Sequence, residues 1–265
     1  MQNENPFLAD RIRGMYAKNC RMDDLLWSYD GRLNDIGEIS TAKLWDFKAK
    51  VMLKTFIEKE ARFRLVSRLI DHNSSILDWG IGTGEVYELM RNKDNYVGID
   101  VSTELVRRMQ TLYPDGRFHV QDLRTVDSSS TDQVCALEVL EHIQAPILPK
   151  ILLEIHRVLR PGGAIICSVP LYEELQFMTI CCPNCGSLAN KEGHCRSYTP
   201  GLIAAELELA GFAVKQVEFV WTSYRHPLLR IREWLKRAVR FAQPVNAVIR
   251  AEKTGEPPKF GIYAG

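Results

Sequence analysis

From residue 75 onward, short apolar runs alternate with segments that have helical periodicity. The runs that we expect to form strands cover residues 76–79, 96–99, 117–120, 134–137 and 164–169. Their alternation with helices predicts an α/β fold, in which a mainly parallel sheet carries helices on both faces. Because ligands of such sheets bind at the carboxyl ends of the strands, the last residues of each strand are the candidates for a site.

The first expected strand is followed by a loop in which three glycines alternate with other residues. These glycines are Gly80, Gly82 and Gly84. They allow sharp turns and let a ligand approach the backbone without meeting a Cβ atom. A nicotinamide-dinucleotide fingerprint needs glycine or alanine where this chain has Glu85, whose carboxylate would repel a pyrophosphate. Asp78, just before the loop, instead suits a ligand that has a cationic group and no phosphates.

Acidic residues also follow the next two expected strands. Asp100 ends the second strand, where a carboxylate can accept two hydrogen bonds from a ribose diol. Asp122 follows the third strand and can accept a hydrogen bond from an adenine amine, while apolar neighbours flank the ring. Together with Asp78, these acids predict a pocket for an adenosine that carries an amino-acid tail, which is S-adenosylmethionine.

Four segments resemble motifs of the class I S-adenosylmethionine-dependent methyltransferases. They read ILDWGIGTG at 76–84, YVGIDVS at 96–102, EVLEHI at 138–143 and LRPGG at 159–163. The last two resemble signatures of the group that includes the ubiquinone-pathway O-methyltransferases. The resemblance covers about residues 70–220 and implies a Rossmann-like, mainly parallel seven-stranded sheet. The donor-binding residues that we expect are Asp78, Gly80, Gly82, Gly84, Asp100, Val101, Gln121, Asp122, Leu123 and Glu138.

Three interpretations are open for Glu138, Glu141 and His142, which follow the fourth strand. In the first, Glu138 lies near the methionine part of the donor, Glu141 faces solvent or caps a turn, and His142 is a hydrogen-bonded structural residue. In the second, His142 is a catalytic base that removes the proton of an acceptor hydroxyl, because imidazole titrates near neutrality. The resemblance to ubiquinone-pathway and small-RNA methyltransferases implies the third, in which all three bind a divalent ion such as magnesium.

Four of the seven cysteines crowd into one segment, which favours a metal over a disulfide framework in a reducing cytosol. Cys182 and Cys185 form a Cys-x-x-Cys-Gly knuckle, and His194 and Cys195 follow it. We expect these residues to bind a structural zinc ion, with Cys181 as the other candidate for the fourth ligand. Reduced thiols in a metal-free loop are the alternative.

Lysine and arginine number 34 and the acidic residues 33 in a chain of 265 residues, so the net charge of +1 indicates no dominant nucleic-acid partner. No apolar run is long enough for a membrane helix and the first residues lack a secretory signal, so the expected location is cytoplasmic. We expect an N-terminal helical cap at 1–70 and a methyltransferase domain at 71–265. Within that domain, 171–198 form a cysteine-rich insert and 222–243 a basic amphipathic helix.

The expected function is methyl transfer from S-adenosylmethionine to a hydroxyl of a small metabolite or glycan. The basic helix at 222–243 can serve as a solvated lid, or it can contact an anionic acceptor or a membrane surface weakly. Two alternatives are open. One is an RNA or protein methyltransferase in which the zinc loop and the basic helix hold a macromolecule. The other is a non-catalytic subunit that binds S-adenosylmethionine.

Overall fold

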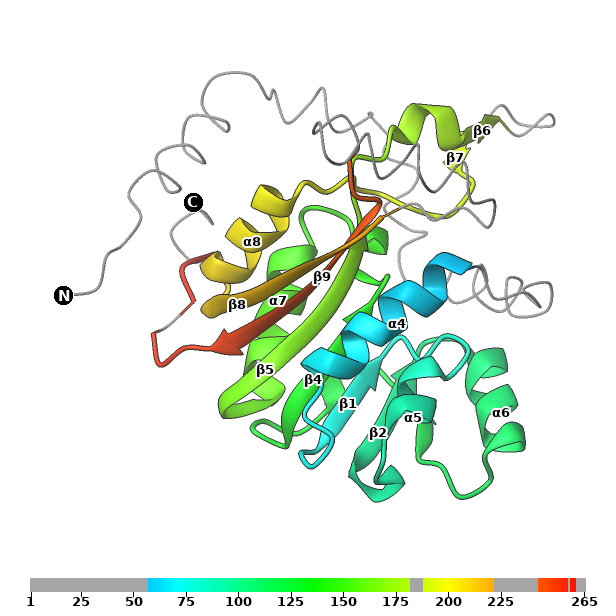
Figure 1. Ribbon diagram of the computed structural model, residues 1–265, viewed down its shortest axis with the longest axis vertical. Helices are drawn as coiled ribbons and strands as arrows, with labels where there is room; N and C mark the ends of the chain where they lie inside the picture. Colours follow the sequence, from blue (N-terminus) through cyan, green and yellow to red (C-terminus); the bar gives the residue numbers. More distant parts are fainter. Residues whose placement is uncertain (1–56, 182–187, 222–242, 257, 261–265) are drawn as a thin grey trace. The chain divides into compact units, whose positions relative to one another are not determined.

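The computed structural model describes residues 57–181, 188–221, 243–256 and 258–260. This part of the chain forms the expected sheet, with seven strands in the order β3-β2-β1-β4-β5-β9-β8 (Figure 1). The strands are Ile76–Trp79 (β1), Tyr96–Asp100 (β2), Phe118–Val120 (β3), Thr131–Leu137 (β4), Leu159–Pro170 (β5), Phe212–Val220 (β8) and Asn246–Lys253 (β9). The pairs among β1 to β5 are parallel, whereas β9 runs antiparallel to both β5 and β8. The mainly parallel α/β architecture is therefore confirmed.

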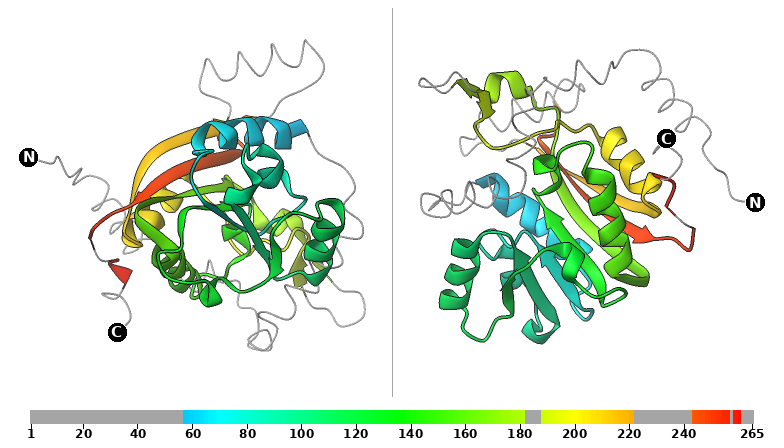
Figure 2. Two further views of the ribbon diagram at one scale, coloured as in Figure 1. Left: turned by 90° about the horizontal axis from the view of Figure 1, so that it is seen from below. Right: turned by 180° about the vertical axis from the view of Figure 1, so that it is seen from behind.

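Helices cover both faces of the sheet (Figures 1 and 2). Those on one face are α4 (Ile57–Leu69), α5 (Glu85–Leu89) and α6 (Thr103–Leu112). Those on the other are α7 (Leu148–Val158) and α8 (Pro200–Leu209). Successive strand residues point to opposite faces of the sheet. Ile76 therefore packs in the apolar core cluster beneath α4, α5 and α6, whereas Leu77 packs in the cluster beneath α7 and α8.

Side-chain caps mark the first turns of two helices, α6 and α8. The side chain of Ser102 accepts a hydrogen bond from the backbone N–H of Leu105 at 3.1 Å. Thr199 caps α8 in the same way through the N–H of Leu202 at 3.2 Å. The start of β5 differs from the prediction, because the strand begins at Leu159 and not at residue 164, and it includes the Pro-Gly-Gly segment at 161–163.

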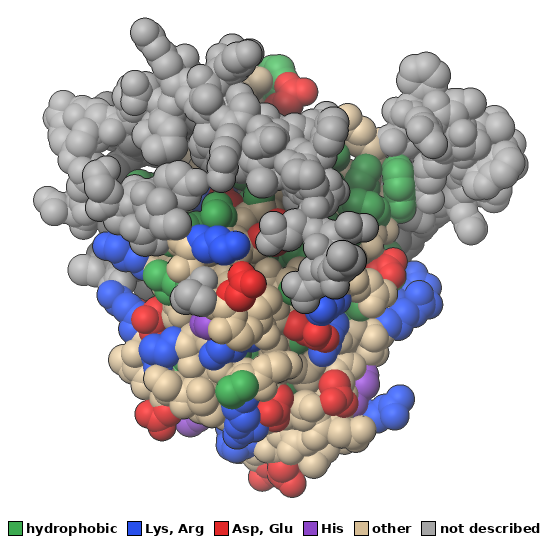
Figure 3. Space-filling model, turned by 90° about the vertical axis from the view of Figure 1, so that its left-hand side faces the viewer, with side chains coloured by type: hydrophobic (Ala, Val, Ile, Leu, Met, Phe, Trp, Pro, Cys, Tyr) green, Lys and Arg blue, Asp and Glu red, His purple; other side chains and the backbone are tan. Residues whose placement is uncertain are grey.

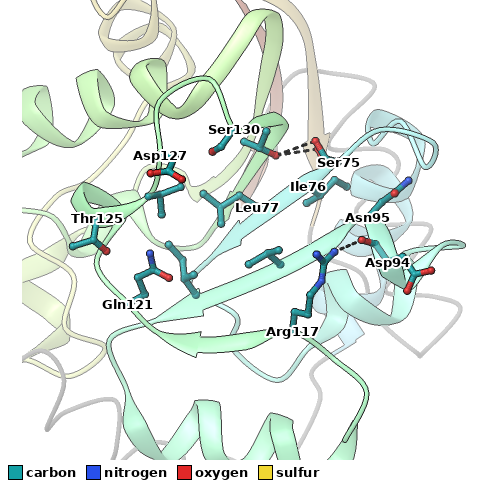
Figure 4. A pocket seen from close by; sticks show the side chains of 14 residues that line it. Ser75, Ile76, Leu77, Asp94, Asn95, Arg117, Gln121, Thr125, Asp127 and Ser130 are labelled. Carbon is teal, nitrogen blue, oxygen red and sulfur yellow. Dashed lines mark hydrogen bonds between the residues drawn. The ribbon is translucent and has the colours of Figure 1, made fainter.

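The connection from β3 to β4 contains only the short 3₁₀ turn η3 (Leu123–Thr125). A full crossover helix would cover this part of the sheet. In its absence a groove of about 360 Å³ lies along the face of β1, β2 and β3 (Figure 4). Of the residues expected in the donor site, its lining includes Gln121. The groove therefore runs from the amino ends of the strands along their face and reaches the carboxyl ends at Ile99 and Gln121.

The insert after β5 contains η5 (Leu175–Met178) and the antiparallel pair β6 (Thr179–Cys181) and β7 (Leu188–Asn190). It lies at the end of the molecule where the parallel strands finish (Figure 1). The knuckle residues Cys182 and Cys185 lie outside the described residues, as do the basic helix and most of the expected N-terminal cap. Among the described helices, none has the length and apolar composition needed to cross a membrane.

Candidate donor site and acidic histidine cluster

The loop after β1 requires glycine at its first glycine position. Gly80 has a φ of +85°, and a Cβ atom there would lie 2.6 Å from Cγ2 of Val139. Its N–H donates to the carbonyl of Ile99 on β2 at 2.9 Å. The ends of β1, β2 and β4 are therefore packed tightly together, with the bare backbone of the loop between them.

Glu85 begins α5 directly after the loop. Its carboxylate accepts hydrogen bonds from the backbone N–H of Thr83, at 3.2 Å, and from the Thr83 hydroxyl. A negative charge in this place is unfavourable for a phosphate. The geometry therefore supports a donor without phosphates, as the sequence predicts.

Asp78 is enclosed beneath the loop. It is 1% exposed, and its carboxylate accepts a hydrogen bond from the hydroxyl of Tyr96 at 2.6 Å. Burial raises the pKa of Asp78 to about 8, and the charges of Glu85 and Asp100 add to this. A cation bound nearby would favour the ionised form. The expected contact of Asp78 with the donor stays a prediction.

Asp100 joins the end of β2 to the glycine loop. Its carboxylate accepts a hydrogen bond from the N–H of Ser102 at 2.8 Å. Burial raises its pKa to about 6, although hydrogen bonds from backbone N–H groups, including those of Ile81 and Gly82, act in the opposite direction. Val101 beside it and Val120 at the end of β3 are exposed, and the expected contact of Val101 with the donor stays a prediction.

The segment after β3 places its residues in different surroundings. Asp122 accepts a hydrogen bond from the N–H of Arg124 at 2.8 Å and pairs with its guanidinium at 2.6 Å, which lowers the pKa of the carboxyl. Leu123 is 1% exposed and belongs to the core, so only its backbone is available to a ligand. The role of Asp122 toward the adenine amine stays a prediction.

Glu138 follows β4 with a φ of +56°, which is unusual for a residue with a side chain. Its carboxylate accepts hydrogen bonds from the hydroxyl of Ser168 at 2.8 Å and from the amide of Asn246 at 3.0 and 3.1 Å. The guanidinium of Arg62 on α4 pairs with it at 2.9 Å. Glu138 directly precedes Val139, which packs against Gly80 of the loop, and its expected role near the methionine part of the donor stays a prediction.

A separate cluster of one glutamate and two histidines lies beyond β4. It consists of Glu141, His142 and His194, and we name it the EHH cluster. One possible ligand atom of each lies within 4.8 Å of those of the others. Glu141 is 0% exposed, and neither of its carboxylate oxygens has a hydrogen-bond partner. Burial and the nearby charge of Glu138 raise its pKa well above the ordinary value.

Both histidines of the EHH cluster are oriented through Nδ1. The carbonyl of Gly193 lies 3.0 Å from Nδ1 of His142, and the carboxylate of Glu173 lies 2.7 Å from Nδ1 of His194. A carbonyl oxygen only accepts, so Nδ1 of His142 carries the proton and its Nε2 keeps a lone pair in the neutral ring. Histidines that bind metals or accept protons are commonly oriented in this way. The sequence pattern did not show that His194 joins this cluster.

The fold and this arrangement define a class I S-adenosylmethionine-dependent methyltransferase. The family model described as "Methyltransferase domain" matches residues 54–217, which is more than half of the chain. The chain belongs to this family. A search of curated proteins finds no match to the sequence.

Solved structures share the fold at low sequence identity. An S-adenosylmethionine-dependent methyltransferase from Archaeoglobus fulgidus is 17% identical, with 79% of this chain and 99% of that chain covered and a TM-score of 0.56. The 1,6-didemethyltoxoflavin-N1-methyltransferase of Burkholderia thailandensis, whose crystal structure holds 1,6-didemethyltoxoflavin and S-adenosylhomocysteine, is 20% identical, with 74% and 79% covered and a TM-score of 0.51. The [4+2]-cyclase SpnF is 22% identical, with 73% and 80% covered and a TM-score of 0.52. At these identities the likeness concerns the fold.

Proposed function

We propose that this methyltransferase acts on a hydroxyl group of a small metabolite or glycan. The observation that supports the proposal is the EHH cluster, which lies just past the end of β4 and beside Glu138. A hydroxyl becomes a good nucleophile only as its proton leaves, and either a base or a divalent cation can promote that loss. The EHH cluster has the chemical groups for both.

When bound, S-adenosylmethionine supplies an electrophilic methyl group on a sulfonium. The glycine loop would receive its methionine part, Asp100 its ribose and Asp122 its adenine amine. Because the reaction is a direct displacement, the protein has to align oxygen, methyl and sulfur and to exclude water. Few groups besides a proton acceptor are needed for the displacement itself.

For a divalent ion, the ligands that the geometry supports are Glu141, His142 and His194. Glu138 fits this role less well than the sequence implied, because Arg62, Ser168 and Asn246 already use its carboxylate. Two imidazoles and one carboxylate suit manganese or zinc better than magnesium, which prefers oxygen ligands. If His194 binds this ion, a zinc ion at Cys182 and Cys185 needs its other ligands from Cys181 and Cys195.

Measurements on His142→Ala separate the roles of the EHH cluster. If His142 is the base, the variant should lower the rate of methyl transfer by about 10²–10⁴-fold. The acid limb of the pH–rate profile should disappear, while the affinity for the donor stays nearly the same. As a metal ligand, its loss is partly offset by added manganese, and a chelator inactivates the wild type. If His142 has only a structural role, the variant should have a lower thermal stability than the wild type and the same pH–rate profile.

The acceptor can be found by screening hydroxylated metabolites and glycans for release of S-adenosylhomocysteine. Turnover by the purified chain excludes a non-catalytic subunit, and transfer only to nitrogen or carbon acceptors contradicts the proposal. An RNA acceptor predicts a steep loss of binding with salt. On the face shown in Figure 3, the basic side chains of the described residues are interspersed with acidic ones, which favours a small acceptor over a polyanion.

A further inference from the structure

The insert after β5 presents large apolar side chains to solvent. Its strands β6 and β7 form a two-stranded sheet apart from the seven-stranded one. Phe177 in η5 is 78% exposed and Ile180 in β6 is 56% exposed, and neither belongs to the two apolar core clusters. We name these two residues the insert patch. Apolar side chains that are held in water in this way are unfavourable and are typical of a contact surface.

The insert patch lies at the end of the molecule that carries most of the exposed apolar side chains. Among the described residues, eight large hydrophobic side chains are exposed, and Leu112 is the one at the far end of a helix that leads away from the strand ends. The other seven lie at the strand ends or in segments that follow them, namely Val101, Val120, Ile147, Tyr172, Phe177, Ile180 and Phe219. Val101 and Val120 are expected beside the donor, so the insert offers its apolar surface to another partner.

A strongly basic segment is joined to the fold beside the insert. Residues 221–245 connect β8 to β9, and the N–H of Val245 donates to the carbonyl of Val220 at 2.8 Å. The carbonyl of Val245 accepts a hydrogen bond from the N–H of Leu171, where the insert begins, at 2.9 Å. The course of 222–242 lies outside the described residues, but the sequence of the connection has one acid, Glu233, and six basic residues, Arg225, Arg230, Arg232, Lys236, Arg237 and Arg240. Positive charge and exposed apolar side chains are therefore joined to the fold at the same place.

This combination matches the surface of an anionic lipid bilayer, which is negatively charged at the headgroups and apolar just below them. A second copy of the chain fits less well. A large aromatic side chain covers about 150–250 Å² when it is fully buried, so Phe177 and Ile180 offer far less than the roughly 800 Å² that each partner of a stable protein interface buries.

We propose that the insert patch docks on an anionic lipid bilayer, with Phe177 and Ile180 entering the layer below the headgroups. His194 of the EHH cluster belongs to the same insert, so the bilayer would lie on the side of the molecule that carries this cluster. The inference does not rest on the hydroxyl acceptor proposed above, and its test needs neither acceptor nor turnover. If both proposals hold, the methylated hydroxyl belongs to a lipid or to a glycan that a lipid carries.

The test is co-sedimentation of the full chain with vesicles of phosphatidylcholine, either alone or mixed with phosphatidylglycerol. The wild type should bind the anionic vesicles at least about 10-fold more tightly than the neutral ones. The double variant Phe177→Ser, Ile180→Ser should bind the anionic vesicles about 10–100-fold more weakly, because two apolar side chains no longer leave water. Phe177→Trp should keep the wild-type affinity, since tryptophan favours the membrane interface.

Leu112→Ser is the matched control for Ile180→Ser, because both side chains are 56% exposed and Leu112 ends α6, away from the insert. Ile180→Ser should weaken vesicle binding, whereas Leu112→Ser should not. A wild type that binds neither kind of vesicle, or both alike, overturns the proposal. So does a double variant that binds as the wild type does. A wild-type dimer in sedimentation velocity that the double variant lacks, without vesicle binding, assigns the insert patch to a second copy of the chain and also overturns it.

Discussion

The side-chain amide of Asn246 donates hydrogen bonds to both carboxylate oxygens of Glu138, at 3.1 and 3.0 Å, across a sequence separation of 108 residues. Asn246 begins β9, and its register partner on β5 is Pro170. The antiparallel course of β9 brings its first residue to the edge where the parallel strands end. A residue near the end of the described chain thus fixes an acid that follows β4.

We expect Asn246→Ala to lower the free energy of unfolding by about 1–3 kcal/mol, because a largely enclosed carboxylate loses two hydrogen bonds. Asn246→Asp should lower it further, since a second carboxylate would face that of Glu138. Urea denaturation measures both changes. Equal stability of Asn246→Ala and the wild type would show that Ser168 and Arg62 are sufficient to hold Glu138.

Gly80→Ala should destabilise the fold by about 1–3 kcal/mol, because the new Cβ meets Val139 and the backbone has a positive φ. Adding Val139→Ala should recover only the part due to the clash, so a double-mutant cycle separates the two causes. The control is Gly201→Ala, a helical glycine with open space around it, which should gain about 0.5–1 kcal/mol. Identical losses with and without Val139→Ala would contradict the contact.

Affinity for 5′-methylthioadenosine should fall as the pH drops through about 6, because protonated Asp100 no longer accepts both hydrogen bonds of the ribose diol. This ligand has the ribose but lacks the charged tail, so titration of groups that face the tail matters less. Calorimetry across this pH range should show no such fall for Asp100→Asn, which binds weakly throughout. In Asp122→Asn the fall should persist, because Arg124 lowers the pKa of Asp122 below this range.

Asp78 should make the protein less stable as the pH rises. Its pKa is about 8 in the folded chain against 3.8 for an ordinary aspartate, so the folded state holds the proton over a range in which the unfolded chain has released it. The free energy of unfolding therefore decreases from about pH 4 to about pH 8. Urea unfolding of Asp78→Asn should lack this decrease, and its advantage over the wild type should grow with pH. Parallel pH profiles for the two proteins would show that Asp78 is ionised throughout.

Much of the fold could be predicted because buried parallel strands leave a local signal. The run at 76–79 is found as β1, and Ser102 and Thr199 cap helices as their types suggest. The predicted start of β5 was wrong, because the strand is extended by pairing with β4, in which Leu159 lies opposite Thr131. No local pattern in a Pro-Gly-Gly segment indicates that partner.

The donor site could be predicted in outline because its acids follow successive strands. The EHH cluster could not, because His194 reaches it only when the insert folds back, where the N–H of Cys195 donates to the carbonyl of Glu141 at 2.8 Å. The resemblance also implied that Glu138 and Glu141 could bind one ion together. The chain instead has a positive φ at Glu138 followed by the 3₁₀ turn η4 (Leu140–His142), so Glu138 has partners of its own.

The place of β9 in the sheet has a consequence for how the protein matures during synthesis. Among the described strands it comes last in the sequence, yet it lies between β5 and β8, and β8 has no other partner in the described sheet. Until β9 emerges, the nascent chain exposes the open edges of two strands, which are sites for association with other chains. The partners of Glu138 at the strand ends would therefore be incomplete until residue 246 has emerged, and a ribosome stalled before it would hold a chain with its site unfinished.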